Sequence, residues 1–535
     1  MKRIITLSFI FISIISFGQQ ANLFTIPNQS AQFIRMPSRG ASTEIDAVFY
    51  NPAGLTKMDE GVYFSINNQI LNQKTTVTSD YRFYTDGAKE YPGSVTSFIF
   101  PNFYAAYNKK KISIHGGFFL VGGAGGATYT NLPVSDRGIA DIAPALQNSP
   151  GIGLYDLDNQ ILANTGTNPQ FSDITDYRFN FENKGLGFSP SVQVGASYRF
   201  NDIFSASLGF RWARQVVQSK GFVTDIEIYN EHHGGWTAPG DYLRYIANQP
   251  YSEINSGLYN ISADVYGDLG ADRYIDVKET GSGITPIVGV NISPNDKWNI
   301  GLKYEHRTKT TMTTTVNNGK DGGLKYQPER DTLESTPVFV DGRKYRADLP
   351  GSISGGVSYQ ATDKWKINAG GRYMFLKQAV MNGREQYIDG GYYELEFATE
   401  YQVAEKFAVS GGYTYNRAAV NQGYHNDIDF WLPGHTIGLG GQVDVIDELS
   451  INFGGMFTKF KTSEFTYDNH YFADNHSIAE GPADYEPTYD MKFEKSAYIF
   501  VVGLDFSFTK GNNETTSNNN TSSQNEDIPY YYRAQ

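Results

Sequence analysis

Alternation of apolar and polar residues is the main pattern along this chain. In residues 186–200 the even positions are mostly apolar, while the odd positions are polar, glycine or serine. The same alternation returns in four further segments, 204–212, 297–304, 393–403 and 498–508. Because successive side chains of a strand point to opposite faces, each segment predicts a strand with one apolar and one polar face.

Fourteen such strands can be counted, which is an even number, as outer-membrane barrels require. They are predicted near 61–73, 95–108, 111–121, 186–200, 203–217, 274–293, 297–316, 349–362, 364–378, 390–404, 406–420, 432–446, 448–462 and 496–510. Short connections alternate with long ones, as periplasmic turns alternate with external loops in such barrels. The sequence therefore predicts an all-β fold, a 14-stranded antiparallel transmembrane β-barrel.

The two faces of the predicted strands differ as a barrel in lipid requires. Glu394, Glu396 and Glu400 share one face, which must therefore be in contact with water. Aromatic residues gather beside the short turns and predict a girdle at the periplasmic interface; they are Tyr198, Phe200, Phe204, Trp298, Tyr359, Trp365 and Phe407.

Composition supports the barrel over other classes. Aromatic residues make up 15% of the 535 residues and charged residues 19%, with 55 glycines. A mean hydropathy of −0.42 argues against a helical multi-span protein. The net charge of −13 argues against nucleic-acid binding, and the absence of cysteine excludes a lipoprotein anchor, disulfides and thiolate chemistry.

The two ends of the chain have compositions of their own. Lys2 and Arg3 precede an apolar run that ends at Phe17, which predicts a signal peptide over 1–18 and export to the outer membrane of a bacterium. Residues 511–535, rich in Asn, Thr and Ser, predict a disordered C-terminal tail.

A short motif lies between the signal peptide and the first strand. Within Asp46 to Leu55, Asn51 fits a helix N-cap and Pro52 the first helical position, followed by Ala53. In this context the motif resembles the hatch motif of the FadL family of outer-membrane long-chain fatty acid transporters, which includes TodX-type aromatic hydrocarbon channels. Segments around Thr285–Tyr304 and Asp348–Tyr359 also resemble the strand pairs of that family.

The resemblance implies an architecture and a function. Residues 19–60 would form a hatch of short helices inside the barrel of residues 61–510. The protein would be a passive uptake channel for long-chain fatty acids or similar hydrophobic compounds. The alternatives are a monoaromatic hydrocarbon channel of the same fold, and an adhesion or haem-binding barrel through which nothing passes.

In the family the ligand leaves sideways through an opening at a kink in the third strand. The glycines of the matching stretch here are Gly116, Gly117, Gly122, Gly123, Gly125 and Gly126. Consecutive glycines in a strand indicate a bulge or a broken ladder, although the start of a flexible loop explains them equally well.

Ligand contacts are expected at two places. External capture is assigned to Trp236, Tyr242, Leu243, Tyr245 and Ile246, with packing of this helix against neighbouring loops as the alternative. Inside the lumen, strand parity points Arg199, Arg211, Lys303 and Arg372 inward, where they would bind a carboxylate or pair with Glu394, Glu400 or Asp505.

Other chemistry finds no support in the sequence. No nucleophile context indicates an enzyme, and no cofactor or metal is expected, since the adjacent His232 and His233 are too few for a metal site. The expected partners are a hydrophobic small molecule, outer-membrane lipid and lipopolysaccharide, and we expect a monomer.

Overall fold

The structure is a computed structural model that describes residues 30–148, 153–250, 256–321, 325–327, 332–334, 339–468 and 488–509. The predicted signal peptide, the first part of the predicted hatch and the predicted C-terminal tail lie outside these residues.

Antiparallel strands make up most of the described chain. The fourteen wall strands, one of which is formed by β8 and β9 together, are β1 (Gly61–Asp80), β2 (Lys89–Lys109), β3 (Ile112–Tyr129), β4 (Asp176–Arg199), β5 (Phe204–Asn230), β7 (Arg273–Asn295), β8 (Trp298–Glu305) with β9 (Thr311–Asp321), β13 (Ser352–Thr362), β14 (Trp365–Met374), β15 (Ile388–Ala404), β16 (Phe407–Val420), β17 (Gly434–Ile446), β18 (Leu449–Phe460) and β20 (Thr488–Thr509). Short strands accompany them: β6 (Gly235–Thr237), β10 (Lys325–Gln327), β11 (Thr332–Glu334), β12 (Lys344–Arg346) and β19 (Ser463–Asp468). The predicted number of wall strands is confirmed.

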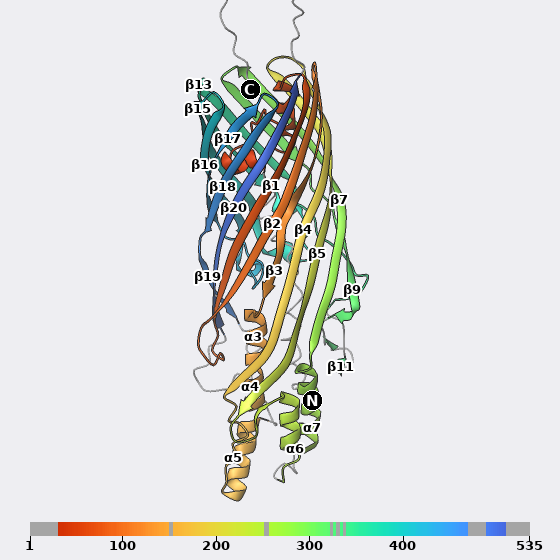
Figure 1. Ribbon diagram of the computed structural model, residues 1–535. Helices are drawn as coiled ribbons and strands as arrows, with labels where there is room; N and C mark the ends of the chain where they lie inside the picture. Colours follow the sequence, from red (N-terminus) through yellow and green to blue (C-terminus); the bar gives the residue numbers. More distant parts are fainter. Residues whose placement is uncertain are drawn as a thin grey trace, which may run out of the picture.

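The sheet closes on itself. β1 pairs with β2 on one side and with β20 on the other, from Gly61 opposite Thr509 to Asp80 opposite Asp490. Closure pairs the first wall strand with the last, so the sheet has no terminal edge strand. The short turns lie at one end of the barrel, and helices α4 to α7 lie beyond the other (Figure 1).

Several strands run further than predicted. β4 begins at Asp176 rather than near 186, and β5 continues to Asn230 rather than ending near 217. Their pairing continues out to Asp176 opposite Tyr229. These outer parts of the two strands lie in water, so their outward-facing side chains need not be apolar and the alternation is lost. Arg178 of β4 forms an ion pair with Glu227 of β5 there.

The barrel is apolar outside and polar inside. Leu208 and Leu439 are 67% and 64% exposed, whereas Ser191 and Asn291 are fully buried on the lumen side. Exposed aromatics stand beside the short turns, where Trp298 packs on Tyr359 with ring centroids 4.4 Å apart. Apolar side chains outside and polar side chains inside are the reverse of a soluble protein, and they define a lipid-facing surface with an interfacial girdle.

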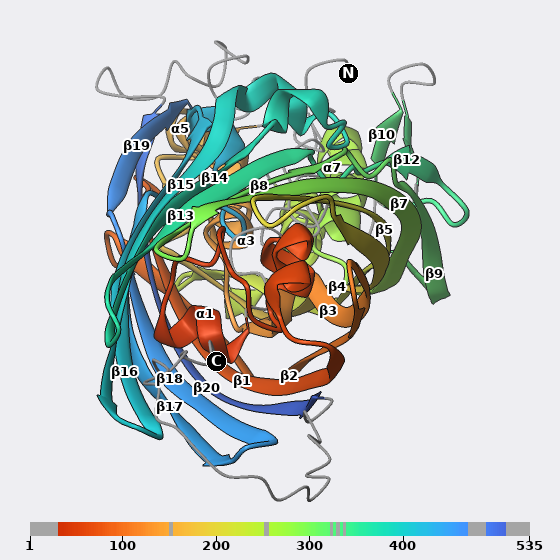
Figure 2. The same ribbon diagram turned by 90° about the horizontal axis from the view of Figure 1, so that it is seen from above.

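The described part of the predicted hatch lies inside the lumen (Figure 2). It consists of three short helices, α1 (Ala31–Arg35), α2 (Ala47–Tyr50) and the 3-10 helix η3 (Pro52–Lys57). Ser30 caps α1, and its hydroxyl oxygen accepts a hydrogen bond from the Phe33 amide.

Helices outside the barrel form an external lobe together with the outer ends of β1, β2, β4 and β5. They are α3 (Pro133–Ala140), α4 (Ile142–Asn148), α5 (Leu154–Thr165), α6 (Pro239–Ala247) and α7 (Ser256–Leu269). Their shared core is rich in tyrosine and includes Tyr81, Tyr177 and Tyr259. None of the helices in the described ranges is both long and apolar enough to cross a membrane.

Candidate functional site: the lumenal pocket and its hatch

The Asn-Pro-Ala motif fixes the hatch to the barrel wall. Pro52 opens η3 and Asn51 occupies its N-cap position, both as predicted, but the Asn51 side chain makes no capping hydrogen bond. The Asn51 Nδ2 group instead donates to Oδ1 of Asn291 on β7, 2.8 Å away. The helix end is held by the wall, because the hydroxyls of Ser197 and Ser205 donate to the carbonyls of Pro52 and Ala53.

Glycine on the inner wall makes this approach possible. A Cβ at Gly301 of β8 would overlap both the Gly40 carbonyl oxygen and the Asn51 side-chain amide. Backbone of the hatch and backbone of the wall thus meet where the wall carries no side chain.

A buried arginine anchors the other side of the hatch. Arg35 is completely buried and forms an ion pair with Glu400 of β15. It also donates to Asn452 at 2.8 Å and to Ser410 at 3.1 Å. Glu400 also lies 3.1 Å from Lys366 of β14, so removing Arg35 would leave this carboxylate with one of its two cations.

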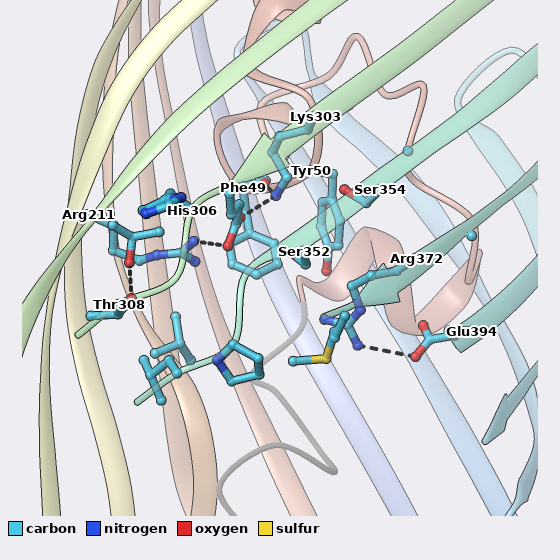
Figure 3. Close-up of a pocket in the computed structure, with 18 of the residues that line it drawn as sticks. Phe49, Tyr50, Arg211, Lys303, His306, Thr308, Ser352, Ser354, Arg372 and Glu394 are labelled. Carbon is cyan, nitrogen blue, oxygen red and sulfur yellow. Dashed lines mark hydrogen bonds and ion pairs between the residues drawn. The ribbon is translucent and has the colours of Figure 1, made fainter. Parts of the chain in front are cut away.

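A pocket that is partly continuous with solvent lies between the hatch and the wall. The hatch supplies Phe33, Phe49 and Tyr50, whose rings pack on one another (Figure 3). Gly40 of the hatch segment also lines the pocket. The other lining residues come from the wall and its connections: Val121, Arg211, Thr285, Lys303, Glu305, His306, Thr308, Leu349, Pro350, Ser352, Ser354, Gly371, Arg372, Met374, Glu394 and Glu396.

The cations of the pocket are already paired with acids. Arg211 and Lys303 both bind Glu305, with the Lys303 Nζ atom 2.7 Å from its carboxylate. Arg372 lies 3.2 Å from Glu394. The lining thus holds three cations and three acids, and Arg211 and Lys303 share the single carboxylate of Glu305.

Three of the four lumen cations expected from strand parity meet in this pocket: Arg211, Lys303 and Arg372. Arg199 lies elsewhere, half-buried beside the short turn, where it contacts the Lys110 carbonyl. Of the acids expected as partners, Glu394 pairs with Arg372, whereas Glu400 pairs with Arg35 of the hatch. Asp505 accepts hydrogen bonds from Gln32 and Asn452.

The residues expected to capture ligand are mostly inside the external lobe. Tyr242, Leu243 and Ile246 of α6 are at most 1% exposed and belong to its hydrophobic core. Tyr245 is 43% exposed and Trp236 is half-buried. The geometry matches the alternative that this helix packs against its neighbours, so these five residues form no continuous exposed patch.

The glycine-rich stretch of β3 coincides with an interruption in the wall. β2 and β3 pair from Lys109 opposite Ile112 to Phe103 opposite Phe118, and then only at Val95 and Ser94, opposite Ala127 and Thr128. The ladder between β3 and β4 also shifts register on both sides of Gly123, whose φ is +82°. Gly122, Gly123, Gly125 and Gly126 lie within the stretch without recorded β2 partners, while Gly116 and Gly117 lie in the paired part before it.

The two adjacent histidines have separate surroundings. Within the described ranges, His232 Nε2 lies 3.0 Å from an oxygen of Asp173 and 3.4 Å from one of Glu231, on the exposed surface. His233 packs on Phe171 and hydrogen-bonds the Pro169 carbonyl, so its role is structural.

The fold and the lumenal site together define a hatch-closed transmembrane β-barrel. Among solved structures, the chain is similar to a Pseudomonas aeruginosa FadL homologue, with a TM-score of 0.54 and 12% identity over 91% of this chain and 100% of that one. It is also similar to the P. putida toluene transporter TodX, with a TM-score of 0.49 and 12% identity over 88% and 95% of the two chains. No family model and no curated protein sequence matches the chain.

Proposed function

We propose that this protein is a passive uptake channel for hydrophobic molecules in the outer membrane of a bacterium. The carrying observation is the aromatic pocket between hatch and wall, inside the lumen of a barrel with a lipid-facing surface. Pockets that combine apolar surface with placed polar groups are typical ligand sites, and here the hatch rings supply much of the apolar part and the wall supplies the polar part. The likeness in fold to a FadL homologue supports the same role.

The described hatch lies in the lumen near the short turns, where Lys57 donates to the Asp202 carbonyl. A hatch in the direct path to the periplasm supports release through the wall instead. The broken ladder between β2 and β3 supports a lateral opening there, bordered by the glycines of β3. This assigns Gly122, Gly123, Gly125 and Gly126 to the exit.

The pocket favours a neutral ligand over a carboxylate. Arg211, Lys303 and Arg372 each contact an acid, so a ligand carboxylate would have to compete with Glu305 or Glu394 for them. Leaving a buried carboxylate unpaired is costly. A neutral hydrophobic compound, including a monoaromatic hydrocarbon, needs no such exchange, whereas a long-chain fatty acid would enter most readily in its protonated form.

Several parts of the proposal extend beyond the pocket. Residues 1–18 act as a cleaved signal peptide, 19–60 as the hatch and 511–535 as a periplasmic tail. The protein works as a monomer among outer-membrane lipid and lipopolysaccharide, without a cofactor and without catalysis.

Ligand retained through purification tests the proposed function. We expect extraction of the purified protein to yield a hydrophobic compound, and Ser354→Trp, which fills the pocket, to abolish its retention. Ser282→Trp on the exposed side of β7 is the matched control and should retain the compound. Retention that Ser354→Trp leaves unchanged would place the ligand on the external surface and contradict the channel.

A further inference from the structure

Two buried aromatic residues lie where the ladder between β2 and β3 breaks, Phe100 of β2 and Phe119 of β3. Phe119 directly follows the last β2–β3 pair before the interruption, which joins Phe103 and Phe118. Its side chain is completely buried on the lumen side, whereas Phe118 points outward and is 39% exposed.

Phe119 is also in contact with the pocket. Its ring meets Phe49 edge to face, with centroids 4.8 Å apart, and Phe49 lines the pocket. Val121, two residues further along β3, lies in the interrupted stretch and lines the pocket as well. The pocket therefore reaches the wall at the place where β2 and β3 stop pairing.

The ring is held in this position by the wall. A Cβ at Gly117 would lie 3.2 Å from the ring of Phe119 and 3.2 Å from that of Tyr104, so the two rings cover the bare face of this glycine. The Phe119 carbonyl accepts a hydrogen bond of 2.8 Å from the Ser191 hydroxyl on β4. The backbone of Phe119 is thus held by a side chain of β4 at the point where the pairing of β3 with β2 ends.

We propose that Phe119 is the residue that sets the size limit for passage from the lumenal pocket to the lateral exit. This inference rests on the proposed function and adds the residue that selects among ligands. Its ring packs against Phe49 at the start of the interrupted ladder, so a molecule that leaves the pocket at this point passes along the ring. A smaller side chain admits larger molecules, and a larger side chain closes the route.

The test is uptake by a strain that lacks the gene and carries variants at residue 119. The two substrates are labelled toluene and the larger neutral compound biphenyl, and the amount of protein in the outer membrane is measured for each variant. We expect Phe119→Ala to raise the ratio of biphenyl to toluene uptake about tenfold, the order of discrimination that apolar contacts provide. Phe119→Leu should give an intermediate ratio, and Phe119→Trp should lower uptake of both substrates.

Phe118→Ala is the matched control, because it removes the same ring from the lipid-facing side of the same strand. If the residue 119 variants give the same ratio of biphenyl to toluene uptake as Phe118→Ala, the size limit lies elsewhere and the inference is wrong. If the unmodified protein takes up neither substrate better than the deletion strain, the proposed function itself fails. Should Phe119→Ala not reach the membrane, the order of Leu, Phe and Trp still decides the question.

Discussion

Asn51 of the hatch and Asn291 of β7 are joined by a hydrogen bond of 2.8 Å between their side chains, and both residues are fully buried. Asn291 donates in turn to Asn299 on β8, whose own amide donates to the Ala41 carbonyl. A chain of amides therefore runs from the hatch to the wall and back to the hatch.

Removing the first of these amides should loosen the hatch without unfolding the barrel. Asn51→Ala removes one of the two hydrogen bonds that Asn291 Oδ1 accepts, the other coming from Asn299, and such a loss costs about 0.5–1.5 kcal/mol, too little to open a closed sheet. We expect more frequent openings in planar-bilayer conductance recordings. Asn72→Ala, which removes an exposed hydrogen bond to Thr96, should leave conductance unchanged; equal conductance in the two variants would show that the asparagine pair does not hold the hatch.

Replacing the buried Arg35 should loosen the hatch more than replacing Asn51. Arg35→Gln removes one of the two cations that pair with Glu400, the other being Lys366, and breaking a buried pair costs up to about 3–5 kcal/mol. We expect higher conductance than for Asn51→Ala, and faster protease cleavage between residues 30 and 60. The exposed pair of Arg178 and Glu227 provides the comparison, since Arg178→Gln should change neither measurement.

The glycine seat of the hatch can be tested by adding a single methyl group. Gly301→Ala places a Cβ against the Gly40 carbonyl and the Asn51 amide, so the hatch must move. We expect new protease cleavage within the hatch while the barrel keeps its resistance to detergent. Gly257→Ala on α7 has no atom within 4 Å of the added Cβ and should behave as the unmodified protein. An unchanged cleavage pattern in Gly301→Ala would contradict the observed seat.

The external lobe should become less stable as the pH rises. Burial raises the pKa of Asp141, between α3 and α4, to about 7, against the opposing effects of its Tyr81 hydrogen bond and Arg137. Because the folded pKa lies above the unfolded one, the folded lobe favours the protonated acid. Its contribution is complete below about pH 4 and is lost as the pH rises through 7, by at most about 1.4 kcal/mol per pH unit.

Hydrogen exchange of α3 and α4, corrected for intrinsic rates, measures this effect. We expect faster exchange at pH 8 than at pH 5, and Asp141→Asn should reduce the difference. Asp156→Asn, at an exposed position of α5, is the control and should leave the difference unchanged. Slower exchange at the higher pH would contradict the assignment.

Much of the barrel was predictable, because lipid forces each strand to alternate between an apolar and a polar side. That pattern located all fourteen wall strands. It failed beyond the membrane, where β4 and β5 continue in water and polar residues occupy both faces. Such an extended hairpin is held by backbone hydrogen bonds, which place little demand on the side chains. Side-chain alternation therefore cannot distinguish it from a loop.

The lumenal site was predictable only in part. Strand parity placed Arg211, Lys303 and Arg372 inward, and the same rule would have found Glu305, two residues after Lys303. The roles of Phe33, Phe49 and Tyr50 depend on how the hatch docks, which no local pattern encodes. For α6, a stripe of Tyr242, Leu243 and Ile246 fits a capture surface and a packed helix equally well, and the external lobe buries it.

Uptake by living cells tests the central claim most directly. A strain lacking the gene would be given labelled toluene and a labelled long-chain fatty acid, then restored with the intact gene or with Asn51 and Pro52 both changed to Ala. The account predicts that deletion lowers uptake of the neutral compound, that the intact gene restores it, and that the hatch variant does not restore normal uptake. Equal uptake of both compounds with and without the gene would contradict the account and leave a barrel that binds at its surface.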